Sequence, residues 1–401
     1  MDKNRIRIAL FNNLNNSNFS IARHLRDRGY EVTLFLLNEF EHFMPINDTY
    51  DEKDLKMVRT LDWYDRGFWT SNKEIRKVAS EHDFLIATGV IPAYMFKAGI
   101  DLDLLFPMGG EISSGPFFIW DKKKSIISQF GLYYAKYCLR RGLRRTKKVS
   151  IPYYDDTFEG YLKKLGLVQN RSFDPAPFIY IPQYQTASFK EYSQNNELYR
   201  KISQIKAETD LLIIQQSRQE IANPKILDYK GNDRLLRAFK QIIQVNNINA
   251  HLVLFEHGTD VALSKKLIQE LEIHQYVTWL PLTPRKNIMA VLSLADVGVG
   301  ILSDFSFITY GSLLELLVMN IPVIHHYAED KIKNIHFETM YPYINAHTEQ
   351  EVLESLLLVY NNKEKYKKFA STGREWVQKN IIDSSLDMIE SMIIDKQNRN
   401  Q

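Results

Sequence analysis

The sequence has little cysteine, no long apolar run and almost no net charge. Its single cysteine, Cys138, cannot form an internal disulfide, and no Cys/His group has zinc-ligand spacing, so we expect Cys138 to be a small residue on a helix. No run of about 18 apolar residues occurs, which argues against a membrane-spanning helix. The net charge of +3 is too small to indicate a nucleic-acid partner.

Further motifs are lacking, and each absence narrows the function. No Gly-x-Gly-x-x-Gly follows the first apolar strand, which argues against a dinucleotide-dependent dehydrogenase. No Asp-x-Asp metal motif stands out, so we expect chemistry that uses no metal and no other cofactor. The first apolar run is too short for a signal peptide and is typical of a strand. A cytoplasmic location is the resulting expectation.

The length and the pattern predict two α/β domains. Domains usually hold about 100–200 residues, so 401 residues suggest two. Short apolar strands alternate with helices in both halves, which predicts two doubly wound, parallel sheets. The expected strands are 5–11, 30–37, 84–88, 103–107, 147–152, 178–182, 210–216, 251–256, 277–280, 295–302 and 321–326. The expected parts are domain 1–182, polar linker 183–208, domain 209–385, and a C-terminal helix or tail 386–401 that would pack back on the first domain.

The second half offers two candidate ligand-binding loops, because ligands of such sheets sit at the carboxyl ends of the strands. Gly311 and Ser312 lie at a helix start, where free N–H groups favour a phosphate, and Glu315 one turn later can accept hydrogen bonds from two ribose hydroxyls. Arg218 follows strand 210–216, and Lys230 precedes the next helix; both suit a diphosphate. Plain helix caps and solvated surface charge are the alternatives.

Several short motifs in this half occur in the order of a known family. They are Arg218, Lys230-Gly231, Ala295-Asp296-Val297, Gly311-x-x-x-Glu315 and Ile321-Pro322-Val323. As a set, over about residues 208–385, they resemble the family-four glycosyltransferases of the GT-B type. The resemblance implies two Rossmann-like domains that face each other across a cleft, and a retaining transfer from a nucleoside-diphosphate sugar. It also implies that Arg218 and Lys230 grip the donor diphosphate and that Glu315 binds the donor ribose.

The motifs depart from the family pattern in three places. Asn320 takes the place of a glycine, and the interval between Arg218 and Lys230 is longer than usual. The family often carries a second glutamate that touches the donor sugar, and counting back from Glu315 puts Phe307 there. Asp304 is the nearest upstream acid, so we expect it to contact the donor in place of that glutamate.

The first half offers two weaker candidates. The loop after the first strand is glycine-rich in the family but reads NNLNNSN here, and Asn13, Asn16 and Ser17 are the expected donor contacts. A capping loop without a ligand is the alternative. Glu111 follows a Gly-Gly pair, and we expect it to be a general base for the acceptor hydroxyl or to bind the acceptor. An exposed glutamate in a turn is the alternative.

A basic segment lies between these candidates and the linker. Lys122 to Tyr154 contains ten Lys and Arg residues, no acid, and several interleaved aromatic residues. A basic helix with aromatic side chains can sit on an anionic membrane surface. The alternatives are a solvated face and a site for a polyanionic acceptor.

Together these features predict a glycosyltransferase that moves a sugar to a glycan, glycolipid or other envelope acceptor. We expect it to be cytoplasmic, at the inner face of the plasma membrane, and to have no nucleic-acid partner. A GT-B sugar-nucleotide epimerase or hydrolase is one alternative, and a catalytically silent GT-B partner subunit is another.

Overall fold

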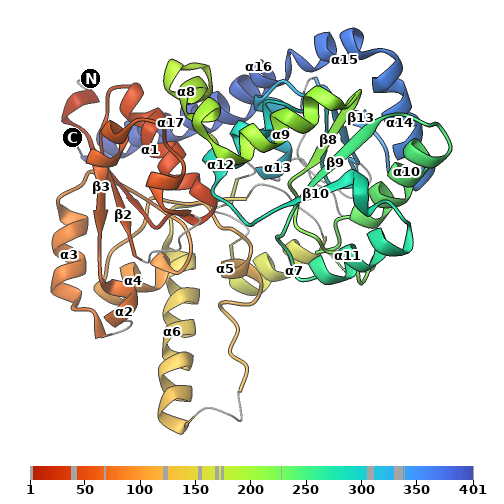
Figure 1. Cartoon of the computed structure of the whole chain (residues 1–401). Coiled ribbons are helices and arrows are strands. Elements are labelled where there is room, and N and C mark those ends of the chain that lie inside the picture. The colour runs from red at the N-terminus through yellow and green to blue at the C-terminus, as the bar shows by residue number, and fades with distance from the viewer. Residues whose placement is uncertain are drawn as a thin grey trace. The chain divides into compact units, whose positions relative to one another are not determined.

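A computed structural model describes residues 3–37, 43–66, 69–120, 125–151, 156–167, 171–172, 176–226, 228–304, 311–328, 337 and 339–400. The chain forms two compact units, shown in Figure 1. Unit 1 contains the described residues up to Tyr180 and those from Ile381 onward, and unit 2 contains those from Ile181 to Asn380. Each unit is described by itself.

Unit 1 is built on a parallel sheet whose strand order is β3-β2-β1-β4-β5-β6-β7. The central strand β1 pairs with β2 and β4, with Phe11 opposite Phe35 on one side and Ala87 on the other. The strands are β1 Arg7–Phe11, β2 Glu31–Leu36, β3 Val58–Thr60, β4 Phe84–Ala87, β5 Leu104–Leu105, β6 Lys148–Ser150 and β7 Arg171–Ser172. The helices are α1 Ser17–Asp27, α2 Trp63–Arg66, α3 Asn72–Ser80, α4 Ile91–Ala98, α5 Gly110–Ser113, α6 Ile126–Arg145, α7 Asp156–Leu165 and α17 Ser384–Asn400.

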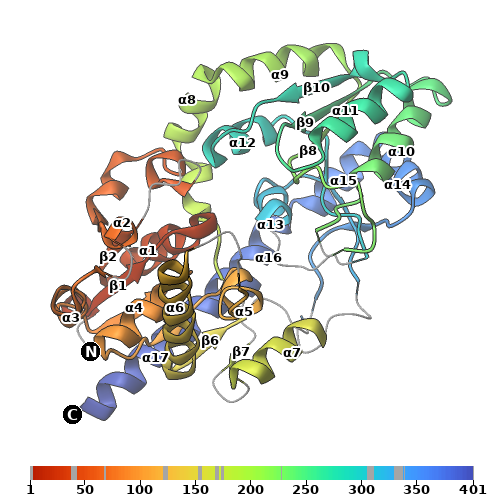
Figure 2. The ribbon, with the colours of Figure 1, turned by 90° about the horizontal axis from the view of Figure 1, so that it is seen from below.

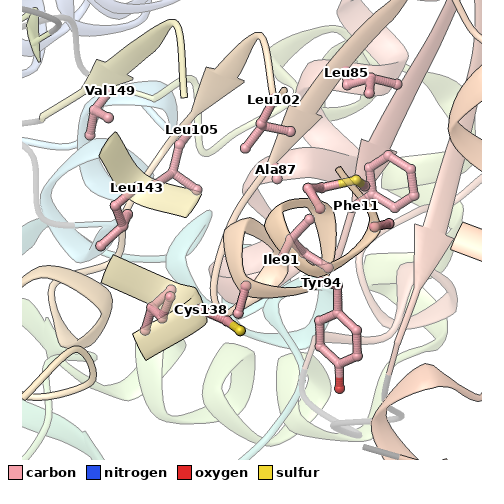
Figure 3. Packing of buried hydrophobic residues seen from close by; sticks show 14 of the residues in the cluster. Phe11, Leu85, Ala87, Ile91, Tyr94, Leu102, Leu105, Cys138, Leu143 and Val149 are labelled. Atoms are coloured by element: carbon pink, nitrogen blue, oxygen red, sulfur yellow. The ribbon is translucent and has the colours of Figure 1, made fainter. Parts of the chain in front are cut away.

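Apolar side chains from the strands and from the helices around them form one core of unit 1. Figure 3 shows Phe11, Leu85 and Ala87 from the sheet together with Ile91 from α4 and Cys138 from α6. Cys138 is a buried free thiol on a helix, as the sequence predicts. Helix α6 can approach α4 closely because Gly142 has no side chain: a Cβ there would lie 1.9 Å from the Pro92 carbonyl oxygen.

The prediction of a strand at Phe178–Pro182 is wrong. Residues 178–180 are irregular, and Ile181–Gln185 form a 3₁₀ helix. The apolar side chains of this segment are buried against α1 and not in the sheet: the Phe178 carbonyl accepts from Ser20 Oγ at 3.1 Å, and the Tyr180 ring stacks against the guanidinium of Arg23. A short apolar run predicts that its side chains are buried, but it does not predict whether the run is a strand, a helix or a loop.

Helix α17 packs on α1 within unit 1. Arg28, just past the end of α1, donates to Asp387 at 2.7 Å and to Glu390 at 2.8 Å, and Lys3 reaches Glu390 at 2.6 Å. Lys396 pairs with the buried carboxylate of Asp103 at 2.7 Å. These ion pairs hold α17 against residues near the start of the chain, Lys3 and Arg28, and against Asp103, which directly precedes β5.

Unit 2 has a second parallel sheet, in the order β10-β9-β8-β11-β12-β13, with helices on both faces (Figure 2). The strands are β8 Leu211–Gln215, β9 Ala250–Phe255, β10 Val277–Leu280, β11 Val297–Val299, β12 Val323–His325 and β13 Ile344–Asn345. The helices are α8 Ala187–Asn195, α9 Glu197–Glu208, α10 Asn232–Gln244, α11 Val261–Glu270, α12 Arg285–Leu292, α13 Gly311–Val318, α14 Glu349–Asn361, α15 Lys363–Ala370 and α16 Gly373–Val377. The sequence predicts five of these strands and misses the two-residue β13.

Residues 183–208 are not an irregular linker, because most of them form α8 and α9. Thr186 caps α8 by accepting from the Phe189 N–H at 3.2 Å, and Asn196 caps α9 by accepting from the Tyr199 N–H at 3.0 Å. Polar composition suggested a linker, although Thr and Asn are the residues that begin helices. Lys206 of α9 pairs with Asp296 beside β11, which fixes α9 on unit 2.

Both sheets reverse their strand order beside the first strand of the unit, between β1 and β4 and between β8 and β11. In open α/β sheets, ligands bind outside the carboxyl ends of the strands at such a switch point. The loops after β8 and β11 are therefore the first place to look for a site in unit 2, and the loops after β1 and β4 in unit 1.

Candidate functional site

The loop after β8 carries Arg218 at the switch point of unit 2. Its side chain is 42% exposed and lies 3.0 Å from Asp228 Oδ1 and 3.8 Å from Glu220 Oε1. Ion pairs this exposed contribute little to stability, so the guanidinium can exchange these carboxylates for an anionic ligand at small cost.

This loop is held in place by the loop after β9. Glu220 accepts from the Thr259 hydroxyl at 2.6 Å and from the Thr259 N–H at 3.1 Å. The Asp260 carboxylate accepts from the main-chain N–H groups of Ile221 and Ala222, each at 2.8 Å. A Cβ at Gly258, whose φ is +117°, would lie 2.4 Å from the Gln219 carbonyl oxygen. The close approach that glycine permits therefore fixes the path of the segment that carries Arg218.

Lys230 and Gly231 lie between this loop and the end of β11. The Lys230 N–H donates to the Glu220 carbonyl at 3.0 Å, and the Lys230 carbonyl accepts from the Leu302 N–H at 2.9 Å. Gly231 has a φ of +73°, and a Cβ there would lie 2.9 Å from Leu302 Cβ. The pair therefore needs glycine both for its backbone conformation and for its contact with β11.

The Lys230 side chain is buried, and this burial together with the positive charge of Arg218 lowers its pKa to about 8. The structure thus brings these two predicted cations close enough to repel each other. A group of two cations with one partly desolvated is suited to an anion that carries more than one charge.

Helix α13 begins beside the same loop. The Gln216 Nε2 group donates to the Ser312 carbonyl at 2.8 Å and approaches Glu315 Oε2 at 3.5 Å. Gln216 precedes Arg218 by two residues, so the first turn of α13 and the Arg218 loop lie side by side at the carboxyl edge of β8. A Cβ at Gly311 would meet no described atom within 4 Å.

Glu315 is buried and forms an ion pair with Arg285, the first residue of α12, at 2.9 Å between Oε1 and Nε. No short sequence motif marks Arg285 or Gln216 as a site residue. Gln216 follows β8 and Arg285 follows β10, however. Because ligands of such sheets bind at the carboxyl ends of the strands, both residues lie where a site is expected.

Asp304 lies in a polar cluster beyond β11, β12 and β13. Its carboxylate contacts His347 Nε2 and lies 4.0 Å from Arg234, and the His347 ring stacks on His326 with the centroids 4.3 Å apart. A contact between Asp304 and the donor stays a prediction. Phe307, the position where the family carries a glutamate, lies outside the described residues.

His325 is fully buried, and burial lowers its pKa to about 3, so the ring is neutral at physiological pH. Its Nδ1 accepts from the Ile301 N–H at 3.1 Å, which gives it a structural role between β12 and β11.

In unit 1, the predicted donor contacts bind groups of their own loop and, through Asn13, the main chain at Phe43. Asn13 Nδ2 donates to the Phe43 carbonyl at 2.6 Å, and its Oδ1 accepts from the Phe19 N–H at 2.9 Å. Ser17 Oγ donates to the Leu14 carbonyl at 2.9 Å. Asn16 is buried with a φ of +58°, a conformation that asparagine tolerates. Contacts of Asn13, Asn16 and Ser17 with a donor stay predictions.

Glu111 joins two loops at the carboxyl edge of the unit 1 sheet. Its Oε1 accepts from the Gly89 N–H after β4 at 2.8 Å, and its Oε2 accepts from the Met108 N–H after β5 at 3.1 Å. Burial raises its pKa, although these main-chain hydrogen bonds favour the charged form. Glu111 is therefore not an exposed glutamate in a turn, which was the alternative that the sequence left open. Its roles as a general base or as an acceptor ligand stay predictions.

The basic segment forms α6, whose first half extends beyond the rest of unit 1 (Figure 1). Ile126, Ile127, Phe130, Tyr133 and Tyr134 are each about half exposed or more. Residues 122–124 and 152–155 lie outside the described part of the chain.

Four cations in the second half of α6 bind other groups of unit 1, and three of these groups are main-chain carbonyl oxygens. Lys136 donates to the Phe117 carbonyl, Arg140 to the Pro116 carbonyl and Arg144 to the Leu165 carbonyl, and Arg145 pairs with Asp101 at 2.6 Å. Only the last of these contacts neutralises a charge.

One Asp-x-Asp pair does occur in the chain, at Asp101 and Asp103. Asp103 is buried and binds Lys147 and Lys396, and Asp101 binds Arg145, so both carboxylates have cationic partners. Within the described ranges, no group of three or more His, Cys, Asp and Glu side chains is placed to hold a metal ion. No helix in those ranges is both long and apolar enough to cross a membrane.

Solved structures share this architecture, whereas the sequence matches no protein-family model and no curated protein. HepE of Anabaena, in complex with UDP and glucose, aligns over 98% of this chain and 100% of its own, with a TM-score of 0.60 and 14% identity. WaaG, a glycosyltransferase involved in lipopolysaccharide biosynthesis, aligns over 95% and 99%, with a TM-score of 0.55 and 14% identity. A Listeria monocytogenes protein, provisionally assigned as a UDP-N-acetylglucosamine 2-epimerase, aligns over 98% and 97%, with a TM-score of 0.54 and 13% identity.

The two parallel sheets define an α/β protein with two Rossmann-type units. The similarity to HepE and WaaG over almost the whole chain shows that this is the GT-B fold, which confirms the fold that the sequence predicts.

Proposed function

We propose that the chain is a glycosyltransferase that takes a sugar from a nucleoside-diphosphate sugar bound at the carboxyl edge of the unit 2 sheet. One observation carries the proposal: Arg218, Lys230, Glu315 and the first turn of α13 gather around the end of β8 at the switch point. The solved complex of the structurally similar HepE with UDP and glucose supports a nucleotide-sugar donor.

The proposed chemistry rests on stabilising the leaving group. As the bond between the sugar and the diphosphate breaks, negative charge develops on the departing phosphate oxygen. Arg218, Lys230 and the N–H groups at Gly311 and Ser312 meet that charge as fixed donors, which is the largest single contribution in many enzymes. With two side-chain cations at this place, the transfer needs no metal ion; the retaining outcome rests on the family resemblance.

A ligand screen tests the donor site. We expect UDP, GDP, ADP or CDP, or a sugar derivative of one of them, to raise the melting temperature of the protein, since a ligand that binds only the native state stabilises it. Arg218→Ala and Glu315→Ala should remove that shift. Full donor binding by both variants would show that the site is elsewhere.

Product analysis separates transfer from the two alternatives. The structural similarity to a Listeria protein provisionally assigned as an epimerase keeps epimerisation or hydrolysis open as a second function. An epimerase or hydrolase converts the bound sugar nucleotide without an added acceptor, whereas a transferase needs a glycan or lipid-linked acceptor. A silent subunit would bind a donor without turnover, or bind none.

We also propose that α6 rests on an anionic membrane surface, which would place the enzyme at the inner face of the plasma membrane beside a lipid-linked acceptor. Ile126, Phe130, Tyr133 and Tyr137 recur every three or four residues, so they share one helix face. The same face continues with the exposed cation Arg141, followed by Arg144 and Arg145. An apolar stripe that ends in cations matches the order of acyl chains and anionic headgroups.

Vesicle flotation tests this surface. We expect binding to vesicles with anionic lipid at low salt, and weaker binding at high salt because salt screens the cations. Ile126→Ser with Phe130→Ser should reduce binding, whereas Val245→Ser, a similarly exposed position in unit 2, should not. Failure of the unchanged protein to bind anionic vesicles at low salt removes the proposal and leaves the donor site untouched.

A further inference from the structure

Gln216 presents a buried acceptor at the centre of the candidate donor site. Its side chain is 6% exposed, and its Nε2 group is directed at the Ser312 carbonyl and Glu315 Oε2. Because both neighbours are acceptors, this contact fixes which end of the amide is nitrogen. Oε1 then has no hydrogen-bond donor among the residues that the structure describes. A buried acceptor without a donor is rare in native proteins and points to a group that arrives with a ligand.

The groups around Gln216 define the chemistry of that ligand. Glu315 Oε2 and Gln216 Oε1 are both acceptors, so the ligand must bring donors, and the carboxylate disfavours a phosphate. Arg218 and Lys230, two and fourteen positions further along the same loop, supply the cations. The site therefore has one end lined by hydrogen-bond acceptors and another lined by cations. A nucleoside diphosphate matches both ends, because its ribose diol donates hydrogen bonds and its diphosphate is an anion.

Arg285 sets the geometry of the acceptor end. Its guanidinium and the Glu315 carboxylate are about nine-tenths buried and 2.9 Å apart. Arg285 stands at the first position of α12, where the helix dipole disfavours a cation, so local helix stability does not account for it. Its contact with Oε1 orients the carboxylate while Oε2 stays on the side of Gln216.

The family resemblance already implies that Glu315 binds the donor ribose. We infer that Gln216 Oε1 accepts a hydrogen bond from one hydroxyl of that ribose, and that Arg285 is the positioning residue of this diol site. The inference rests on the proposed nucleotide-sugar donor and adds to it a ligand-contacting residue and a reason for the buried ion pair. The site then recognises ribose by its vicinal diol and requires both hydroxyls.

The test compares ribose with dideoxyribose. The probes are whichever of UDP, GDP, ADP and CDP binds the unchanged protein most tightly, and its 2′,3′-dideoxy analogue, with both dissociation constants measured by calorimetry. We expect the dideoxy compound to bind the unchanged protein at least tenfold more weakly. It lacks both ribose hydroxyls, so the buried acceptors of the site would have no donors in its complex.

Two variants and one matched control assign the residues. Gln216→Met and Arg285→Met should each weaken binding of the ribonucleotide about fivefold to tenfold and leave binding of the dideoxy analogue unchanged within about twofold. Gln241→Met removes a hydrogen bond to Glu349 near the far end of α10 and should change neither constant.

Each outcome decides the inference. Equal binding of the two probes to the unchanged protein overturns it while the donor site stands. Equal weakening of both probes in Gln216→Met or Arg285→Met shows a structural role only and overturns the assignment of that residue. If no nucleoside diphosphate binds the unchanged protein, the proposed donor site fails first and the diol site with it. The comparison on the unchanged protein does not depend on any variant folding.

Discussion

The carboxyl edges of the two sheets use polar side chains in opposite ways. In unit 1, the side chains of Asn13 and Ser17 and the carboxylate of Glu111 bind main-chain groups of the same unit. In unit 2, Arg218 is exposed, Lys230 is a buried cation, and Glu315 pairs with another side chain. Strand order is the same at both switch points, so topology alone does not make a charged site. The difference supports our proposal that the donor binds at the charged edge of unit 2.

The largest effect is expected from breaking the buried pair in unit 2. Glu315→Ala leaves the Arg285 guanidinium buried without its carboxylate, which should cost about 3–5 kcal/mol of unfolding free energy. Urea unfolding measures the loss. Replacing both partners, Glu315→Leu with Arg285→Met, should recover most of it, since an apolar pair of similar volume is tolerated. A single variant as stable as the unchanged protein would mean that the pair is not buried in solution.

Removing the exposed cation should affect binding and leave stability almost unchanged. We expect Arg218→Ala to weaken nucleoside-diphosphate binding about tenfold to a hundredfold, because charged hydrogen bonds contribute about 1.5–3 kcal/mol. Its ion pairs with Glu220 and Asp228 are partly exposed, so unfolding should shift by less than about 1 kcal/mol. Arg237→Ala, at an exposed arginine on α10, is the control and should bind normally. The opposite pattern, lower stability with normal binding, would make Arg218 part of the scaffold.

The burial of Lys230 predicts a pH dependence of donor affinity. Its pKa is about 8 in the free protein, and a bound diphosphate stabilises the charged form and raises that pKa. Affinity should therefore be highest below pH 8 and fall by up to about tenfold per pH unit as pH rises through the free pKa. Calorimetry between pH 6.5 and 9.5 measures this. Lys230→Met should bind more weakly at pH 7 and lose the dependence; an unchanged slope in that variant would assign the titration to another group.

The smallest effect is expected at Glu111 in unit 1. Glu111→Gln keeps the shape but turns an amide nitrogen toward the Gly89 or Met108 N–H, so we expect a loss of about 1 kcal/mol in stability. If the reacting groups lie at the edge of unit 2, the transfer rate of Glu111→Gln should differ from that of the unchanged protein by less than about tenfold. A fall of a hundredfold or more in kcat with normal donor binding would instead establish the general-base role, and the contrast between the two edges would no longer hold.

The sequence predicts most of the architecture because apolar strands and their periodicity are local signals. Nine of the eleven strand predictions lie on strands of at least three residues. Every candidate site residue lies in the loop after a predicted strand or in the helix that follows that loop. The prediction at 178–182 is wrong because α1, and not the sheet, buries that apolar run. The helices in 183–208 were missed because their caps are polar residues that also occur in linkers.

The site is harder to predict because its partners come from distant parts of the chain. Arg218, Lys230 and Glu315 can be named from short motifs. The pairing of Glu315 with Arg285, thirty positions away, and the orphan oxygen of Gln216 depend on how the ends of β8 and β10 meet α13. The sequence also cannot show that the Asn13 side chain already bonds to main-chain groups of unit 1, since an asparagine at this place suits a ligand equally well.

The structure of the protein with its nucleoside diphosphate tests the central claim most directly. The account predicts that the diphosphate lies within hydrogen-bonding distance of the Arg218 and Lys230 side chains and that the ribose hydroxyls lie on Glu315. A nucleotide held instead by the loop after β1, on Asn13 and Asn16, would contradict it, because the charged edge of unit 2 would then have no part in binding the donor.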